Sequence, residues 1–236
     1  MKVHVFNNED AASLAAAMMV CAQVLAKPDA LIALEKAEDL QSTYQKLLAL
    51  YKAGSLALHD TKFFNAVEYC QIEPEKSQGE LLQADFLRQT DCPQENFYNF
   101  AYRENDFIRA AADYEQKIQE SGSLDLAIIT VADDGSILLN QPAPYILNDC
   151  HFTKALRNSS IQPTINPAIE QIPGLTMGMG TLMRAHMIIL PAYGKDKAPA
   201  VANLVRGQID PSCPASFLQL HSCVILLLDE AAAALI

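Results

Sequence analysis

The sequence predicts an α/β fold in which a mainly parallel sheet is covered by helices on both faces, giving a doubly wound three-layer α/β/α sandwich. Short apolar runs of strand length alternate with longer stretches of helical periodicity along the chain. The clearest run opens residues 124–142 (LDLAIITVADDGSILLNQP), and it reads as a central strand buried on both faces. Its end carries Asp133, Asp134 and Gly135. Ligands of such Rossmann-like sheets bind beyond the carboxyl ends of the strands, so this turn is the first candidate site.

Local signals predict the elements of the first half. Residues 1–6 suit an edge strand, and Asn8 is placed to cap a helix over residues 9–26 that ends before Pro28. A buried strand at 29–34 and a helix over 41–53, stopped by Gly54, follow. A short strand at 62–65, a helical piece near 79–89 and a charged amphipathic helix over 105–120 lead into the central strand.

The second half begins with a long irregular segment. Residues 143–173 show little periodicity and several prolines, so we expect a lid or binding loop there. Residues 175–183 place two glycines before a short helix. A strand at 186–192, a helix over 195–206 closed by Gly207, a last strand at 221–229 and a short final helix complete the prediction. Neither a repeat nor a linker divides the chain, so we expect one domain over residues 1–236.

Composition and charge narrow the functional classes. The 17 basic against 28 acidic residues give a net charge of −11, which argues against nucleic acid or an anionic membrane as partner. A phosphorylated substrate would need positive charge concentrated in a pocket. The six cysteines form no CxxC motif, which favours reduced thiols over zinc. Glu9 and Asp10 precede the apolar residues 11–25, unlike a signal peptide, and no run approaches ~20 apolar residues. We expect a soluble cytoplasmic protein without metal or cofactor.

Several collinear segments resemble one family. Residues 43–54 (TYQKLLALYKAG), 64–69 (FNAVEY) and 131–142 (VADDGSILLNQP), together with 175–181, 194–207 and 214–221, are similar to blocks of the glucosamine-6-phosphate deaminase/isomerase family, which includes the sugar-phosphate lactonases. The Asn-Gln-Pro end of the central block favours the deaminase branch. The resemblance implies a carbohydrate-metabolism enzyme that converts glucosamine 6-phosphate to fructose 6-phosphate and ammonia.

The chain departs from the family pattern where the chemistry is done. The resemblance assigns the proton-transferring carboxylate to Val67, the ring-opening histidine to Ser136 and the glutamate that orients it to Gln141; Asp134 alone is retained. The glycine-rich phosphate loop falls on residues 36–40, which lack glycine and carry Glu38 and Asp39. At an effective dielectric constant of about 20, one carboxylate ~4 Å from a phosphate charge costs roughly 4 kcal/mol.

These departures predict a degenerate, non-catalytic family member that binds a small sugar in an altered pocket, or associates with itself or with an active relative. The alternative is an active enzyme, either a sugar-phosphate isomerase/deaminase or one acting on a different, uncharged sugar. His151, Lys154 and Arg157 could serve a new site or be loop charges, and residues 178–181 could be a phosphate nest or a plain turn. His221 and His186 are expected to be structural. The remaining pocket candidates are Lys36, Thr43, Glu68, Gly135, Gly178 and Lys197.

Overall fold

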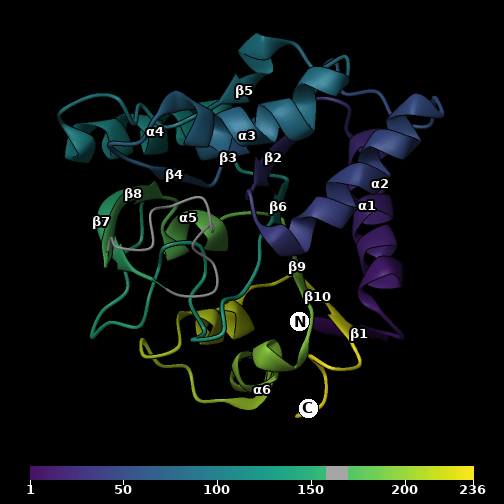
Figure 1. Cartoon of the computed structure of the whole chain (residues 1–236), viewed down its shortest axis with the longest axis vertical. Coiled ribbons are helices and arrows are strands. Elements are labelled where there is room, and N and C mark those ends of the chain that lie inside the picture. Colours follow the sequence, from purple (N-terminus) through teal and green to yellow (C-terminus); the bar gives the residue numbers. More distant parts are fainter. Residues whose placement is uncertain (158–169) are drawn as a thin grey trace.

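The computed structural model describes residues 1–157 and 170–236, and two sheets organise this part of the chain. The larger sheet is parallel and has seven strands in the order β1-β10-β9-β6-β2-β3-β5. Its strands are β1 (Lys2–Phe6), β2 (Leu31–Leu34), β3 (Lys62–Asn65), β5 (Phe97–Tyr98), β6 (Leu126–Ile128), β9 (Met187–Ala192) and β10 (Val224–Asp229). The predicted mainly parallel α/β fold is confirmed, with the 124–142 run supplying the central strand (Figure 1).

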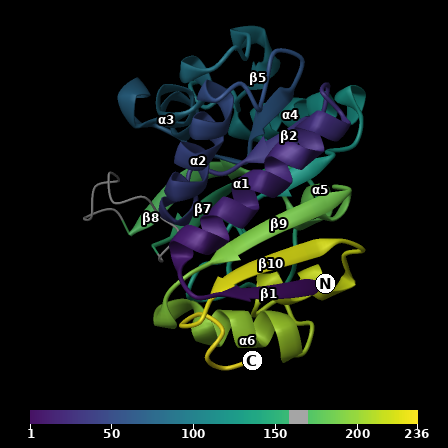
Figure 2. The ribbon, with the colours of Figure 1, turned by 90° about the vertical axis from the view of Figure 1, so that its right-hand side faces the viewer.

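Helices cover both faces of this sheet. They are α1 (Glu9–Ala26), α2 (Gln41–Lys52), α3 (Gln78–Asp85), α4 (Phe107–Ser121), α5 (Met179–Met183) and α6 (Ala198–Arg206). In β2, Ile32 and Leu34 pack into the core formed with α1, α2 and α3. Leu31 and Ala33 point to the opposite core, which contains residues of α4, α5 and α6. Figure 2 shows α1 lying across its face of the sheet. Because helices cover both faces of the sheet, the side chains on both faces of a strand are buried, and the strand sequence is apolar throughout.

The longest helix begins and ends as its sequence predicts. The Asn8 side chain caps α1 by accepting a hydrogen bond from the Ala11 amide at 2.9 Å, and the helix ends at Ala26. By length and composition alone, α1 is the one helix among the described residues that could also span a membrane, which corrects the expectation that no run comes close. Ala16, Ala17 and Val20 are buried against the rest of the fold, and buried core helices pass the same test.

The expectation of an irregular 143–173 segment holds for residues 143–150 and is wrong for residues 151–156 and 171–173. Strands β7 (His151–Leu156) and β8 (Gln171–Thr176) lie in and just beyond it, and they join β4 (Val67–Tyr69) in a second, antiparallel sheet of order β4-β8-β7. Pro173 lies inside β8, where its carbonyl accepts a hydrogen bond from the Cys70 amide. Residues 158–169 of the predicted lid fall outside the described residues.

Smaller differences concern element ends. The predicted 79–89 helix is α3 followed by a 3₁₀ turn at Leu87–Gln89, and a 3₁₀ turn at Lys195–Lys197 precedes α6. The residues after Asp229 form turns rather than the predicted final helix. These positions lie at helix ends, where propensity alone decides little.

Candidate active site

The carboxyl edge of the parallel sheet brings together residues that are distant in sequence. Strands β9, β6 and β2 are neighbours there. Glu35 directly follows β2, Thr130 and the turn at residues 131–136 follow β6, and Lys197 lies in the 3₁₀ turn that follows β9. This edge is where open α/β sheets bind their ligands, as the sequence predicted.

Lys197 is held at this edge by two oxygen partners. Its ammonium donates to the Val131 carbonyl oxygen at 2.5 Å, and it lies 3.3 Å from Oδ2 of Asp39 in an ion pair. Its side chain is 11% exposed. Asp39 belongs to the 3₁₀ turn Glu38–Leu40, in the loop that the family resemblance assigns to phosphate. The Asp39 carboxylate therefore stands beside the cation that a phosphate would need.

Glu35 is a buried carboxyl group that sequence reasoning overlooked. The residue is 4% exposed, and its Oε2 accepts hydrogen bonds from the amide and hydroxyl of Thr130 at 2.6 and 3.1 Å. Burial raises the pKa of Glu35 from 4.5 to about 7; Thr130 and the charge of Lys197 oppose the rise, and Asp39 adds to it. The signal in the sequence was a single acidic residue at the carboxyl end of a buried strand.

The turn after β6 is shaped by its own polar groups. Asp134 is exposed, and its Oδ1 accepts a hydrogen bond from the Ser136 amide at 2.9 Å. Gly135 has φ of 81°, and a Cβ there would lie 2.7 Å from the Cys213 sulfur, so glycine is required. Ser136 is buried, and its carbonyl accepts from the Ala132 amide. The turn thus presents the Asp134 carboxylate at the surface and encloses the serine.

Val67 and Glu68 have different roles from those the family pattern suggested. Val67 is buried in β4, where it pairs with Thr176 of β8, and it offers no ionisable group. Glu68 is fully buried and accepts hydrogen bonds from five groups: the amides of Tyr69, Gln78 and Gly79, the Ser77 hydroxyl and the Asn99 amide side chain. With its oxygens so occupied, Glu68 holds the start of α3 in place and does not serve as a pocket residue.

The two candidate phosphate-binding residues near α2, Lys36 and Thr43, have different surroundings. Lys36 pairs with Asp85 of α3 at 3.0 Å. Thr43 is fully buried in α2, and its hydroxyl has no hydrogen-bond partner among the described residues. The resemblance left Lys197 and Thr43 as the groups suited to phosphate. Lys197 contacts Val131 and Asp39 at the carboxyl edge, whereas the Thr43 hydroxyl is enclosed in α2.

A pocket of about 320 Å³ lies beside residues 139–143 and 145–147, which follow the turn at residues 131–136. Gln141, His151 and Lys154 all line it, which brings two of the three loop charges considered from sequence to one place. The Gln141 side chain pairs with the backbone of Leu156 at the end of β7: its Nε2 donates to the carbonyl at 2.5 Å and its Oε1 accepts from the amide at 2.6 Å. Gln141 thus fastens β7 to the turn and is not directed at Ser136.

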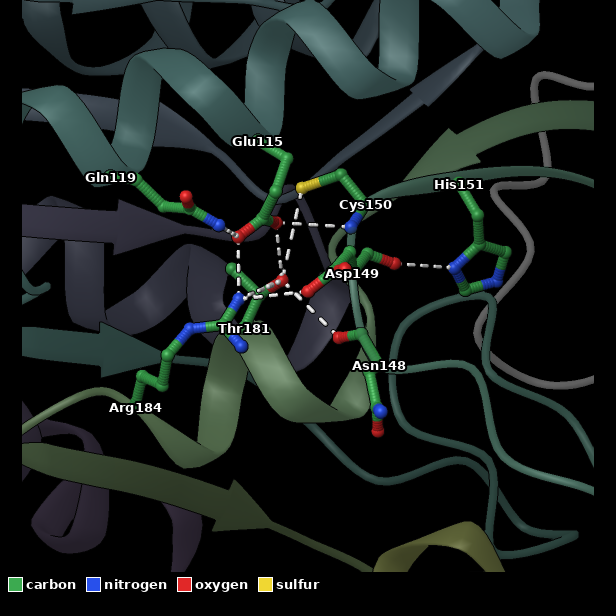
Figure 3. A network of polar contacts seen from close by, with 8 residues as sticks. All are labelled: Glu115, Gln119, Asn148, Asp149, Cys150, His151, Thr181 and Arg184. Carbon is green, nitrogen blue, oxygen red and sulfur yellow. Dashed lines mark hydrogen bonds and ion pairs between the residues drawn. The ribbon is translucent and has the colours of Figure 1, made fainter.

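A network of polar contacts around the Glu115 carboxylate holds residues 148–150, as Figure 3 shows. These residues lie between Leu147 and His151, which line the pocket. Glu115 of α4 accepts hydrogen bonds from the Thr181 hydroxyl at 2.6 Å and the Cys150 amide at 3.0 Å, and it pairs with Arg184 at 2.5 Å. Arg184 also lies 3.2 Å from Asp149. Burial raises the pKa of Glu115, but hydrogen bonds from Thr181, Gln119 and Cys150 outweigh it and leave the pKa below its usual value. The network fixes α4, α5 and residues 148–150 together.

The glycine-containing start of α5 is a structural turn. The amides of Met179 and Thr181 donate to the carbonyls of Leu147 and Asn148 at 3.0 and 2.9 Å. A Cβ at Gly178 would overlap the carbonyl oxygens of Asn148 and Asp149. The chain's own carbonyls occupy these two amides, which favours the plain turn over the phosphate nest.

Two histidines outside the edge behave as expected. His221 is buried between the Ala185 carbonyl and the Cys223 amide at 2.8 and 3.0 Å, which confirms a packing role. His186 precedes β9 and lies 3.6 Å from Asp125, at the opposite edge of the sheet. No cluster of three His, Cys, Asp or Glu side chains suited to a metal occurs in residues 1–157 and 170–236.

Comparison with known proteins gives one consistent assignment. Residues 9–226 match the family described as Glucosamine-6-phosphate isomerases/6-phosphogluconolactonase. The chain is 31% identical over 242 residues to the glucosamine-6-phosphate deaminase of Alkaliphilus oremlandii (strain OhILAs), with 100% of both covered. It is 34% identical over 198 residues to that of Corynebacterium glutamicum (strain R), which covers 81% of this chain and 78% of the relative.

Solved structures agree with the sequence relatives. A monomeric glucosamine-6-phosphate deaminase superposes with a TM-score of 0.93 at 27% identity, covering 100% of both chains. A 6-phosphogluconolactonase from Trypanosoma brucei superposes with a TM-score of 0.75 at 18% identity, covering 99% of this chain and 97% of that one. The second likeness shows the fold alone.

The prediction of a degenerate, non-catalytic protein is wrong. It rested on the residues at positions 67, 136 and 141, yet the full-length match to curated deaminases and to a deaminase with described kinetics favours the active-enzyme alternative. Other ionisable groups, Glu35, Asp134 and Lys197, lie at the same edge of the sheet. On its sequence match and its superposition, the chain belongs to the glucosamine-6-phosphate isomerase/6-phosphogluconolactonase family.

Proposed function

We propose that this protein is an active amino-sugar isomerase/deaminase that converts glucosamine 6-phosphate to fructose 6-phosphate and ammonia. The observation that carries the proposal is the full-length similarity to curated glucosamine-6-phosphate deaminases, together with the TM-score of 0.93 to a solved one. The six free cysteines support a reducing compartment, so we place the enzyme in the cytoplasm.

The groups at the carboxyl edge support this chemistry. Isomerisation moves a proton between two sugar carbons, which needs a carboxylate or another base whose pKa lies near the working pH. Two carboxyl groups lie at this edge, Glu35 after β2 and the exposed Asp134 in the turn after β6, and Lys197 supplies a cation whose charge can stabilise a developing enolate oxygen. Neither role requires a histidine at position 136.

A second candidate is the same reaction on an unphosphorylated amino sugar. The observation that favours it is the ion pair between Lys197 and Asp39, because the carboxylate already neutralises the cation beside which a phosphate would bind. A sugar hydroxyl could donate a hydrogen bond to Asp39, whose Oδ2 accepts none from the described residues. A phosphate would instead meet a negative charge, which costs roughly 4 kcal/mol at ~4 Å and an effective dielectric constant of about 20.

One experiment tests both candidates. Purified protein is incubated with glucosamine 6-phosphate and, separately, with glucosamine, and released ammonia and ketose are measured. Turnover of either sugar supports an isomerase/deaminase, and the preferred sugar selects between the two candidates. Release of ammonia from neither sugar at millimolar concentration would refute the proposal.

A pair of variants sharpens the choice of substrate. Asp39→Asn removes the charge that faces Lys197, whereas Glu38→Gln removes a neighbouring exposed charge for which no contact with Lys197 is found. If the unphosphorylated sugar is the substrate, Asp39→Asn should shift the preference toward glucosamine 6-phosphate more than Glu38→Gln does. An equal shift in both variants would mean that general loop charge, rather than the ion pair, controls selectivity.

A further inference from the structure

We propose that Glu35 is the catalytic residue that carries the proton between C2 and C1 of the sugar, in place of a carboxylate at position 67. The proposal rests on the isomerase/deaminase function proposed above and assigns one step of it to a named side chain. The case stands on where the carboxyl group lies, which groups hold it and which charges face it.

Its position is level with that of Ala66, the residue that directly follows the neighbouring strand β3. Strand β2 pairs with β3 in parallel, with Leu34 opposite Asn65, and the Ala66 amide donates to the Leu34 carbonyl at 2.8 Å. Glu35 therefore follows β2 at the level where the adjacent chain passes through Ala66, one residue before Val67 begins β4 of the second sheet. Because the strands are parallel, side chains at this level share the carboxyl edge. Glu35 thus supplies a carboxyl group at the carboxyl edge, beside the chain that leads from β3 to position 67.

The group is held at one oxygen only. Both hydrogen bonds that the Glu35 side chain receives come from Thr130, and both reach Oε2. Oε1 therefore takes no hydrogen bond from the residues that the structure describes. This differs from Glu68 in β4, whose side-chain oxygens accept hydrogen bonds from five donors. A proton carrier needs one oxygen fixed in place and one left to react.

The charged and titratable groups around Glu35 suit both of its protonation states. Lys197, from the turn after β9, favours the carboxylate, and Asp39, from the turn before α2, favours the acid. Tyr44 of α2 donates its hydroxyl to the Glu35 main-chain carbonyl at 2.6 Å, and burial keeps this phenol neutral by raising its pKa. With burial included, the pKa of Glu35 is about 7, so both forms are populated near neutrality.

The proposed step balances without an added oxidant or reductant. In the open-chain sugar, the Glu35 carboxylate takes the proton from C2, the C2 electron pair forms a C1–C2 double bond, and a proton moves from the C2 ammonium group to the C1 oxygen. The protonated carboxyl then returns the proton to C1, which leaves an imine at C2. Water adds to the imine, and ammonia leaves to give the ketose. Glu35 ends in the state in which it began.

Substitution of Glu35 by a neutral isostere is the direct test. Glu35→Gln keeps an oxygen that can accept from Thr130, so the variant should fold, while kcat should fall by about 10²- to 10⁴-fold with KM changed little. Exchange of the C2 proton with deuterated solvent should fall by the same factor. Glu35→Asp keeps the carboxyl but displaces it, and a displacement of about 1 Å costs ~10²-fold, so its rate should lie between the two.

A buried carboxylate elsewhere serves as the matched control. Asp125 is 6% exposed and binds Lys27 and the Leu31 amide at the amino edge of the sheet, so Asp125→Asn should lower the melting temperature and leave the rate of C2 exchange unchanged. The wild-type kcat should depend on a group of pKa about 7, and Glu35→Gln should lose that dependence. A folded Glu35→Gln variant with wild-type exchange would overturn this assignment alone. A wild-type protein inactive on both sugars would overturn the proposed function and the assignment together.

Discussion

Replacing Glu35 by glutamine should raise the free energy of unfolding much more at pH 8 than at pH 5. Burial raises the pKa of this carboxyl from 4.5 to about 7 in the folded protein, whereas the unfolded chain has the ordinary value. Between these two values the folded state holds a proton that the unfolded state has lost. The stability of the wild type therefore declines as pH rises through this window, and the loss of stability is complete above pH 7.

The size of the effect follows from the shift. Each unit of pKa corresponds to about 1.4 kcal/mol, so the ionised carboxylate costs the folded state about 3 kcal/mol at alkaline pH. Glutamine does not titrate, and its amide oxygen can accept from the Thr130 amide, as Oε2 does in the wild type. The variant should therefore be more stable than the wild type by up to about 3 kcal/mol at pH 8, a large change for a domain of ordinary stability.

Urea unfolding of both proteins at pH 5 and pH 8, followed by circular dichroism, measures this difference. The Asp125→Asn control, which removes a partner of Lys27 and the Leu31 amide, should be destabilised instead of stabilised at pH 8. If Glu35→Gln gains no more stability at pH 8 than at pH 5, ionisation of the buried carboxyl group does not destabilise the folded state. The pKa near 7, on which the proposed role of Glu35 depends, is then refuted.

Other substitutions probe the neighbouring structure. Glu115→Gln should cost about 1–3 kcal/mol at pH 7, because Arg184 and Thr181 lose a charged partner, and the cost should shrink as pH falls through the lowered pKa of Glu115; unfolding at pH 7 and pH 3 checks this. Gly178→Ala should destabilise by about 1–3 kcal/mol or more, since its Cβ overlaps two backbone carbonyl oxygens; an unchanged melting temperature would contradict this. Asp39→Asn should strengthen the binding of glucosamine 6-phosphate by freeing Lys197, as measured by a larger thermal shift at a fixed ligand concentration; the absence of any gain would show that the pair does not limit phosphate binding.

Local signals were sufficient for the parallel sheet and its helices. The uninterrupted apolar residues of β2 and β6 predicted strands buried on both faces, and Asn8 predicted the start of α1, because these patterns act within one turn or one strand. The turn at residues 131–136 was also placed correctly at the carboxyl edge. The position of the site therefore followed from sequence, although its chemistry did not.

The antiparallel sheet and the acid–base groups depended on tertiary structure. Strand β4 pairs with β8, a segment far away in the sequence, and no local pattern records which distant segment completes a hydrogen-bond ladder. Asp39 looked like a repulsive charge until the fold placed Lys197 3.3 Å from it. Glu35 looked like an ordinary residue at the start of a helix, since a pKa is set by burial and by neighbours from other strands. The sequence by itself determined the sheet and the edge that holds the site, and only tertiary packing decided which carboxyl groups there carry an unusual charge state.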